Sequence, residues 1–131
     1  MDKTQIKERA LERYKKERDW FAFLLQAVDL MVTPEMKLQA KLLRILLDAK
    51  QAVVNCVEED KPFIAGYYCN APELFNAMNL PWFMLMETPF LAASAPYILE
   101  DIQGAEDMGL GTDLCTAIRL PIYYIESGLM P

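Results

Sequence analysis

The sequence predicts a helix-rich α/β fold, in which two N-terminal helices are followed by an incomplete Rossmann-like βαβ unit. The first observation is that residues 4–31 and 34–58 have the pattern of two long helices. The second is that residues 62–68 form a short aromatic and β-branched segment, which is typical of a buried strand. The third is a similar segment at 81–87, after a short helical stretch, so that 62–87 has the order strand, helix, strand.

The first predicted helix, 4–31, changes character halfway along. Its first half is highly charged, and neighbouring acidic and basic residues have the i,i+4 spacing of surface ion pairs. Its second half, from Trp20 to Met31, is apolar on nearly every face. We therefore expect that second half to be buried.

The second predicted helix begins with strong start signals. Thr33 is a suitable N-cap, Pro34 suits the first helical position, and Glu35 places an acid in the first turn. Cys56, near the end of this helix, is interpreted as a buried core residue. The positions predicted to form the single apolar face are Leu38, Leu42, Ile45, Leu46, Ala49 and Val53.

The strand at 62–68 is followed by a predicted helix that ends near Met78. Asn70 is its expected cap, with Pro72 in the first turn and Glu73 completing a capping box. Further on, residues 88–103 are predicted to be helical and 104–111 to be a linker. Residues 113–126 form the last predicted helix, capped by Thr112 or Asp113 and interrupted at Pro121. The chain thus divides into a helical segment, 1–61, and an α/β segment, 62–131.

Charge and hydropathy exclude several classes of partner. Residues 62–131 hold eight acidic residues against one basic residue, Arg119, so a nucleic-acid partner is not expected. The apolar stretch 80–99 contains Glu87 and three prolines, which argues against a membrane span. The charged N-terminus lacks a signal-peptide pattern, and three cysteines without such a signal favour the cytoplasm. The absence of histidine excludes His-ligated zinc sites within this chain.

Two of the cysteines, Cys69 and Cys115, stand where helices are predicted to begin. The positive end of a helix dipole favours the thiolate, which is the form that binds metal. The pair therefore indicates a shared iron–sulfur or metal site. Burial of both as small apolar residues remains an alternative, because no Cys-x-x-Cys motif is present. A zinc or redox dithiol site, with a Cys69–Cys115 disulfide, is a further one.

The motifs around these cysteines resemble those of a known family. They are Gly66-x-x-Cys69-x-x-Pro72-Glu73-Leu74, then Ala77-x-x-Leu-Pro81, and later Asp113-x-Cys115-x-x-x-Arg119. Together they resemble the 2-hydroxyacyl-CoA dehydratase and benzoyl-CoA reductase family, including the D-component-like subunits of 2-hydroxyglutaryl-CoA dehydratase. The resemblance covers residues 60–131, and the helical first part has no motif of its own.

The resemblance implies a [4Fe–4S] cluster held by three cysteines, of which Cys69 and Cys115 would be the first two. It implies a homologous second subunit, an ATP-dependent activator that donates an electron, and ketyl-radical chemistry on an acyl-CoA thioester in an anaerobic cytoplasm. Residues 62–131 would be an incomplete cluster-binding domain. The third cysteine of the family comes much later, so we expect this chain to be the N-terminal part of a larger subunit that is not competent alone.

Other residues have two readings each. Glu73 is either a capping carboxylate or a general base near the cluster. Arg119 either forms a salt bridge with Asp113 or Glu126, or pairs with the charge of substrate or cluster. The paired tyrosines at 67–68 and 123–124 are read as core and rim aromatics. The alternative to the enzyme reading is a small non-enzymatic helical interaction module, whose apolar C-terminal half docks on a partner.

Overall fold

The computed structural model describes residues 2–30, 33–66, 72–84 and 95–130, without the side chains of residues 34, 35, 72, 83 and 84. This part of the chain is helix-rich, as predicted, with five helices and two short strands. The elements in chain order are α1 (Lys3–Asp29), α2 (Pro34–Glu58), β1 (Ile64–Gly66), α3 (Pro72–Ala77), β2 (Trp82–Met84), α5 (Ile98–Asp107) and α6 (Thr116–Glu126).

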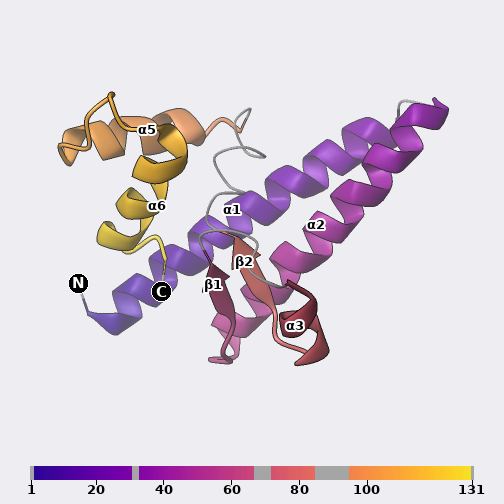
Figure 1. Ribbon diagram of the computed structural model, residues 1–131, viewed down its shortest axis with the longest axis horizontal. Coiled ribbons are helices and arrows are strands. Elements are labelled where there is room, and N and C mark those ends of the chain that lie inside the picture. The colour runs from indigo at the N-terminus through magenta and orange to yellow at the C-terminus, as the bar shows by residue number, and fades with distance from the viewer. Residues whose placement is uncertain (1, 31–32, 67–71, 85–94, 131) are drawn as a thin grey trace.

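The helices α1 and α2 form a long hairpin that dominates the molecule (Figure 1). α1 begins with a capping box, in which Asp2 accepts a hydrogen bond from the Gln5 amide at 2.9 Å and the Gln5 side chain accepts one from the Asp2 amide at 3.2 Å. α2 begins after Thr33, which is extended, with Pro34 in its first turn. Both N-terminal helices are confirmed.

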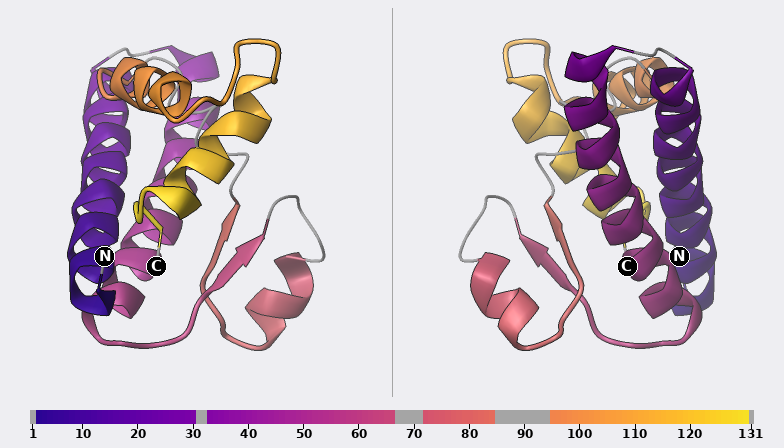
Figure 2. Two further views of the ribbon diagram at one scale, coloured as in Figure 1. Left: turned by 90° about the vertical axis from the view of Figure 1, so that its left-hand side faces the viewer. Right: turned by 90° about the vertical axis from the view of Figure 1, so that its right-hand side faces the viewer.

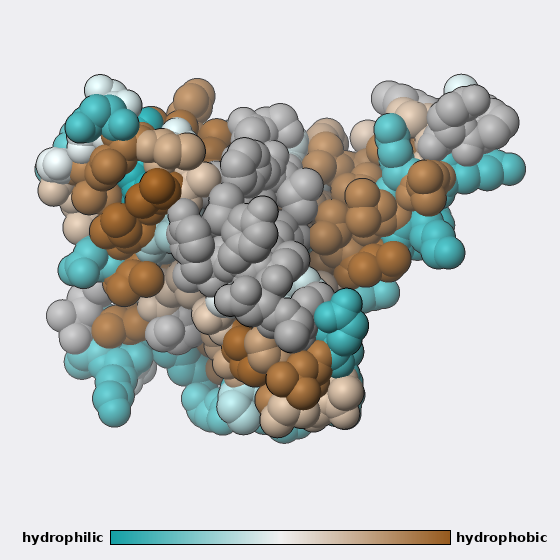
Figure 3. All heavy atoms as spheres, viewed as in Figure 1, coloured by the Kyte–Doolittle hydropathy of each residue, from teal (hydrophilic) through white to brown (hydrophobic). Residues whose placement is uncertain are grey.

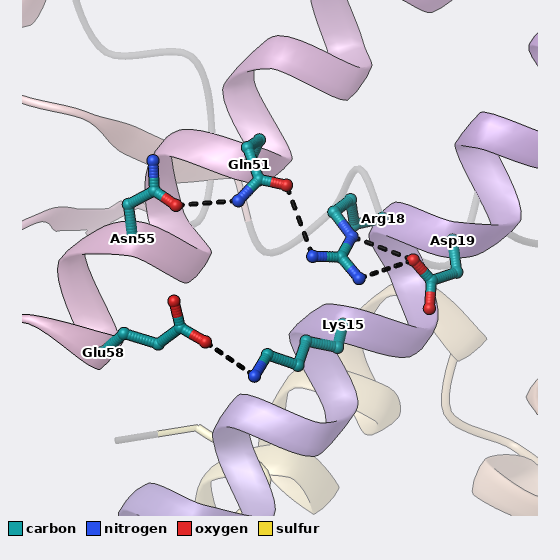
Figure 4. Close-up of polar contacts among 6 residues, drawn as sticks. All are labelled: Lys15, Arg18, Asp19, Gln51, Asn55 and Glu58. Atoms are coloured by element: carbon teal, nitrogen blue, oxygen red, sulfur yellow. Dashed lines mark hydrogen bonds and ion pairs between the residues drawn. The ribbon is translucent and has the colours of Figure 1, made fainter.

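Polar contacts join the first half of α1 to the second half of α2 (Figure 4). The Lys15 ammonium lies 2.6 Å from the Glu58 carboxylate. Arg18 donates to the Gln51 side chain at 3.3 Å, and Gln51 donates in turn to Asn55 at 2.7 Å. These contacts lie outside the apolar core and fix the register of the two helices on one side of the hairpin.

The hydrophobic core lies at one end of the hairpin. There side chains from α5 and α6 join side chains from the first half of α1 and the second half of α2 in one cluster. Figures 1 and 2 show α6 running toward the N-terminal end of α1. Both predicted segments, 1–61 and 62–131, therefore contribute to one core. Its buried members are Ala10, Tyr14, Val53, Val54, Val57, Ile98, Ala105, Leu120, Tyr124 and Met130.

The other end of the hairpin extends beyond this core, which corrects the prediction that residues 20–31 are buried. Phe21 is buried, but Phe23 is 56% exposed and Leu30 is 83% exposed. Trp20 and Phe23 stack on each other at 5.3 Å between ring centroids. The apolar composition of residues 20–31 predicted burial, but it did not show that the core formed with α5 and α6 involves only the first half of α1.

The predicted apolar face of α2 is also largely wrong. Leu38, Leu42 and Ile45 are each more than half exposed, and Ala49 is exposed too. The predicted position Val53 is buried as expected. Because α2 carries apolar residues on two faces, spacing alone did not show which face meets α1. The buried side chains of α2 are Ala40, Lys50, Val53, Val54, Cys56 and Val57.

The two strands pair in parallel, with α3 between them in sequence. The pairing places Ile64 opposite Trp82 and Gly66 opposite Met84. The described part of each strand has three residues, and the last residues of the predicted segments, 67–68 and 85–87, lie outside the described residues. α3 ends as predicted near Met78, and Asn79 follows with a positive φ of 56°. A Rossmann-like unit needs more sheet than this pair, so it remains a prediction.

The last two helices differ from their predicted bounds. α5 continues through Gly104, which was predicted to open a linker, and the turn comes later, at Gly109 with a φ of 83°. α6 starts after Cys115, so Cys115 is the N-cap in place of Thr112 or Asp113. α6 also continues through Pro121, where an interruption was predicted.

Candidate functional site

Cys115 is the predicted ligand whose position the structure describes. It lies at the N-cap of α6, where its carbonyl accepts hydrogen bonds from the amides of Ile118 and Arg119 at 2.8 and 3.0 Å. Its side chain makes no capping hydrogen bond, and its thiol is free and exposed. The thiol is therefore accessible at the positive end of a helix.

Cys69, the other predicted ligand, lies outside the described residues, as do Tyr67, Tyr68 and Asn70. The preceding strand, β1, is described, and the arrows of β1 and β2 both point toward the end of the molecule where α6 begins (Figures 1 and 2). In open parallel sheets, ligand sites lie beyond the carboxyl ends of the strands. The carboxyl end of β1 thus lies toward the end of the molecule where α6 begins.

Cys56 is separate from this end of the molecule. It is buried in the last turns of α2, as predicted, and the end of α2 lies opposite the beginning of α6 (Figures 1 and 2). Cys56 is one of the residues that line a surface pocket, together with Lys7, Lys61 and Phe63. Within this arrangement Cys56 does not replace a missing third ligand beside Cys115.

A complete iron–sulfur donor set is not present in the part of the chain that the structure describes. Among these residues, no three His, Cys, Asp or Glu side chains form a metal-binding group. Cys115 alone fits the donor chemistry of a cluster, as an unpaired and accessible thiol. No catalytic step through a cluster therefore follows from the described side chains.

The structure places Arg119 and Glu73, for each of which the sequence suggested two possible roles. Arg119 is buried and its guanidinium lies 3.1 Å from the carboxylate of Glu106 on α5. Arg119 therefore forms a salt bridge, as predicted, but its partner is Glu106 and not Asp113 or Glu126. Glu73 is exposed in the first turn of α3. Its predicted capping partner lies outside the described residues.

A group of buried charged residues joins α1, α2, α5 and α6, and we call it the buried ionic network. Arg13 contacts the carboxylate of Asp101 at 2.6 Å and donates to the Tyr124 hydroxyl at 2.8 Å. Tyr124 donates to the same carboxylate at 2.9 Å. Glu17 lies 3.6 Å from Arg13 and 3.3 Å from the Lys50 ammonium. The network consists of Arg13, Glu17, Lys50, Asp101 and Tyr124.

Burial governs the ionisation of this network. Burial raises the pKa of the Asp101 carboxyl, while Arg13 and the Tyr124 hydroxyl act in the opposite direction. The pKa of Tyr124 is raised strongly, first by burial. The pKa of Arg13 is raised because its acidic neighbours outweigh the opposing effect of burial. Arg13 also lies over the Tyr97 ring, 4.0 Å from its centroid.

Sequence reasoning missed this network, because it treated Arg13 and Glu17 only as one of the i,i+4 pairs in the charged half of the first helix. A signal was present in the spacing. Arg13 and Glu17 lie on the same helical stripe as Ala10, Tyr14 and Phe21, and all five are buried. A charged pair within an apolar stripe indicates buried partners on another element.

Among the described residues, no helix is long and apolar enough to cross a membrane. The chain matches no protein-family model, and neither the curated proteins nor the solved structures yield a significant match.

Proposed function

We propose that this chain is the N-terminal part of a [4Fe–4S] subunit of the 2-hydroxyacyl-CoA dehydratase and benzoyl-CoA reductase type, with an incomplete Rossmann-like unit. The observation that carries the proposal is the exposed, unpaired thiol of Cys115 at the start of α6. The parallel β1 and β2 strands support it, since Cys69 follows β1 by three residues in the sequence.

In this proposal, Cys69 and Cys115 hold two irons of the cluster. A cluster held there would supply single-electron chemistry for an acyl-CoA thioester, with an ATP-dependent activator as the electron donor. A homologous second subunit and a third cysteine from outside this chain complete the site. The role of α6 is to hold Cys115 at a helix N-terminus with its side chain exposed.

Anaerobic reconstitution with iron and sulfide tests the proposal. The wild-type chain is compared with Cys69→Ser, Cys115→Ser and Cys56→Ser, in the presence of a small dithiol that supplies the remaining ligand. We expect cluster absorption and an EPR signal after reduction in the wild type. Cys69→Ser and Cys115→Ser should lose them, since each removes a thiolate ligand.

Cys56→Ser is the matched control, because Cys56 is buried on α2. It should keep the cluster as long as circular dichroism shows a wild-type helix content. A cluster that survives Cys115→Ser, or one that is lost only with Cys56→Ser, contradicts the proposed ligands. A Cys69–Cys115 disulfide in the oxidised chain would favour the dithiol alternative instead.

A non-enzymatic interaction module is the second candidate, and a surface of α6 favours it. Three apolar side chains follow one face of this helix at helical spacing and remain exposed, and a fourth exposed apolar residue lies just before the helix begins. If docking is the whole function, Cys69→Ser and Cys115→Ser leave partner binding unchanged, whereas Ile118→Asp combined with Ile122→Asp abolishes it. The exposed residues are Leu114, Ile118, Ile122 and Ile125.

A further inference from the structure

The face of α2 opposite α1 has the spacing of a coiled-coil seam. Leu38, Leu42, Ile45 and Ala49 follow one another at intervals of four, three and four residues. Leu38 is 73% exposed, Leu42 53% and Ile45 57%, and Ala49 is exposed as well. We call these four residues the outer face of α2.

The outer face is continuous, and its side chains remain exposed beside the other described residues of the chain. Hydrophobic surface gathers over the middle of α2 in Figure 3, which shows the molecule in the orientation of Figure 1. The opposite side of α2 is already used, since Ala40, Val54 and Val57 are buried there. A helix that is apolar on both sides is typical of an element packed between two neighbours.

We propose that the neighbour on this side is a second copy of the chain, bound through the same face in the antiparallel direction. A two-fold axis between residues 43 and 44 pairs Leu38 with Ala49 of the second copy, and Leu42 with Ile45 of the second copy. Symmetry repeats both pairs, so each large side chain meets a smaller or equal one. Such alternation fills the layers of a helix interface, and an isologous contact closes on itself.

The charges beside the outer face select this antiparallel arrangement. Lys41 and Asp48 flank the seam on the same side, both exposed, and neither forms an ion pair within the described part of the chain. In the antiparallel register Lys41 faces Asp48 of the second copy, twice by symmetry. In a parallel register Lys41 would lie beside the apolar Leu46 of the second copy, and both charges would lose their partners.

The size of the face sets the strength of the dimer. From residue 38 to 49 the helix spans about 18 Å, which is short for a protein interface. The helix is already held in the hairpin, so pairing does not require it to fold. We therefore expect a reversible dimer whose fraction rises with concentration.

Sedimentation equilibrium of the whole chain at low ionic strength tests the interface. The expected result is a monomer that becomes a dimer as concentration rises. Leu42→Glu should remain monomeric, because it buries two carboxylates in the seam. Leu99→Glu is the matched control, since Leu99 is 72% exposed on α5, away from the outer face, and this variant should still dimerise.

Charge reversal tests the antiparallel register. Lys41→Glu and Asp48→Lys should each weaken the dimer by at least about tenfold, because each creates two like-charge contacts. The double variant Lys41→Glu/Asp48→Lys should recover the wild-type dissociation constant within about threefold. Lys3→Glu makes the same change of charge at an exposed position of α1, remote from the outer face, and should have little effect.

Three outcomes would overturn the inference. A chain that stays monomeric at every concentration excludes a second copy as the occupant of the outer face. A dimer that survives Leu42→Glu uses another surface, such as that of α6. Single reversals without effect, or a double variant that fails to recover, exclude the antiparallel register. The inference does not depend on the cluster, so Cys115→Ser should leave the dimer unchanged.

Discussion

Arg13 is the residue on which the buried ionic network depends. Its guanidinium contacts Asp101, Tyr124 and the ring of Tyr97, although its side chain is only 5% exposed. Arg13→Met should lower the free energy of unfolding by about 3–5 kcal/mol, because it leaves buried carboxylates without their cation. Urea denaturation followed by circular dichroism measures this change.

A double variant separates the ion pair from simple loss of packing. Arg13→Met combined with Asp101→Asn removes both charges of the pair and should recover part of the lost stability. If the double variant is as unstable as the sum of the two single variants, Arg13 and Asp101 are not energetically coupled. The 2.6 Å contact between Arg13 and Asp101 would then orient the two side chains without raising the free energy of unfolding.

The pH dependence of stability should also reveal Asp101. Because burial raises the pKa of its carboxyl above the ordinary value of 3.8, the folded state holds the proton more tightly than the unfolded state. Its contribution to stability is thus complete below that value and declines as pH rises through the folded pKa. The stability of the wild type relative to Asp101→Asn should therefore fall as the pH rises above 3.8 and the carboxyl of the folded state loses its proton.

Asp101→Asn is the reference because it cannot titrate, while the other carboxyl groups titrate alike in both proteins. Urea denaturation at several pH values gives the difference between them. A difference that grows as pH rises would mean that Arg13 outweighs burial and that the pKa of Asp101 is lowered.

At the scale of elements, α5 and α6 meet through a glycine. A Cβ at Gly104 would lie 2.6 Å from Cζ and 2.8 Å from Cε2 of the Tyr123 ring, both too close for ordinary contact. Gly104→Ala should therefore destabilise the chain by about 1–2 kcal/mol, although alanine is the better helix former. Thermal unfolding measures the loss.

The same substitution should change sign when the ring is removed. In a Tyr123→Ala background, Gly104→Ala should stabilise the chain by about 1 kcal/mol, since only helix propensity remains. A loss of the same size in both backgrounds would place the strain elsewhere than between α5 and α6.

The helices differ in how far the sequence predicts them. Start signals such as Thr33 and Pro34 are local, and they located α2 correctly. The face that α2 buries depends on where α1 lies. Leu42 and Val54 are both apolar, so the sequence alone does not show that Val54 is buried and Leu42 is exposed. Gly104 was predicted to end a helix for a similar reason, because the sequence does not show that Tyr123 would pack against it.

At the scale of the whole molecule, features set by neighbours in the sequence could be predicted. Contacts between residues far apart in the sequence could not. Arg13 and Tyr124 are 111 residues apart, so no local pattern joins them. The position of Cys115 at a helix start was predictable, since the glycine-rich bend before it is local. Its partnership with Cys69 is a long-range contact and stays a prediction.

The position of the core at one end of the hairpin predicts a gradient of stability along it. Residues 22–29 of α1 include no buried side chain, whereas Ala10, Arg13, Tyr14 and Glu17 are all buried. Backbone amides open more readily where few side chains are buried. In dilute solution, where the chain is monomeric, amides of residues 22–29 should exchange with deuterium at least about tenfold faster than those of residues 10–17.

Hydrogen exchange followed by mass spectrometry resolves these peptides, and its concentration dependence separates two causes of protection. Burial within one chain does not change with concentration. Pairing of the outer face of α2 does, so residues 38–49 should gain protection as the dimer forms, while residues 10–17 do not. Uniform protection along both helices in dilute solution would mean that the far end of the hairpin is as stable as the core, which would contradict the gradient.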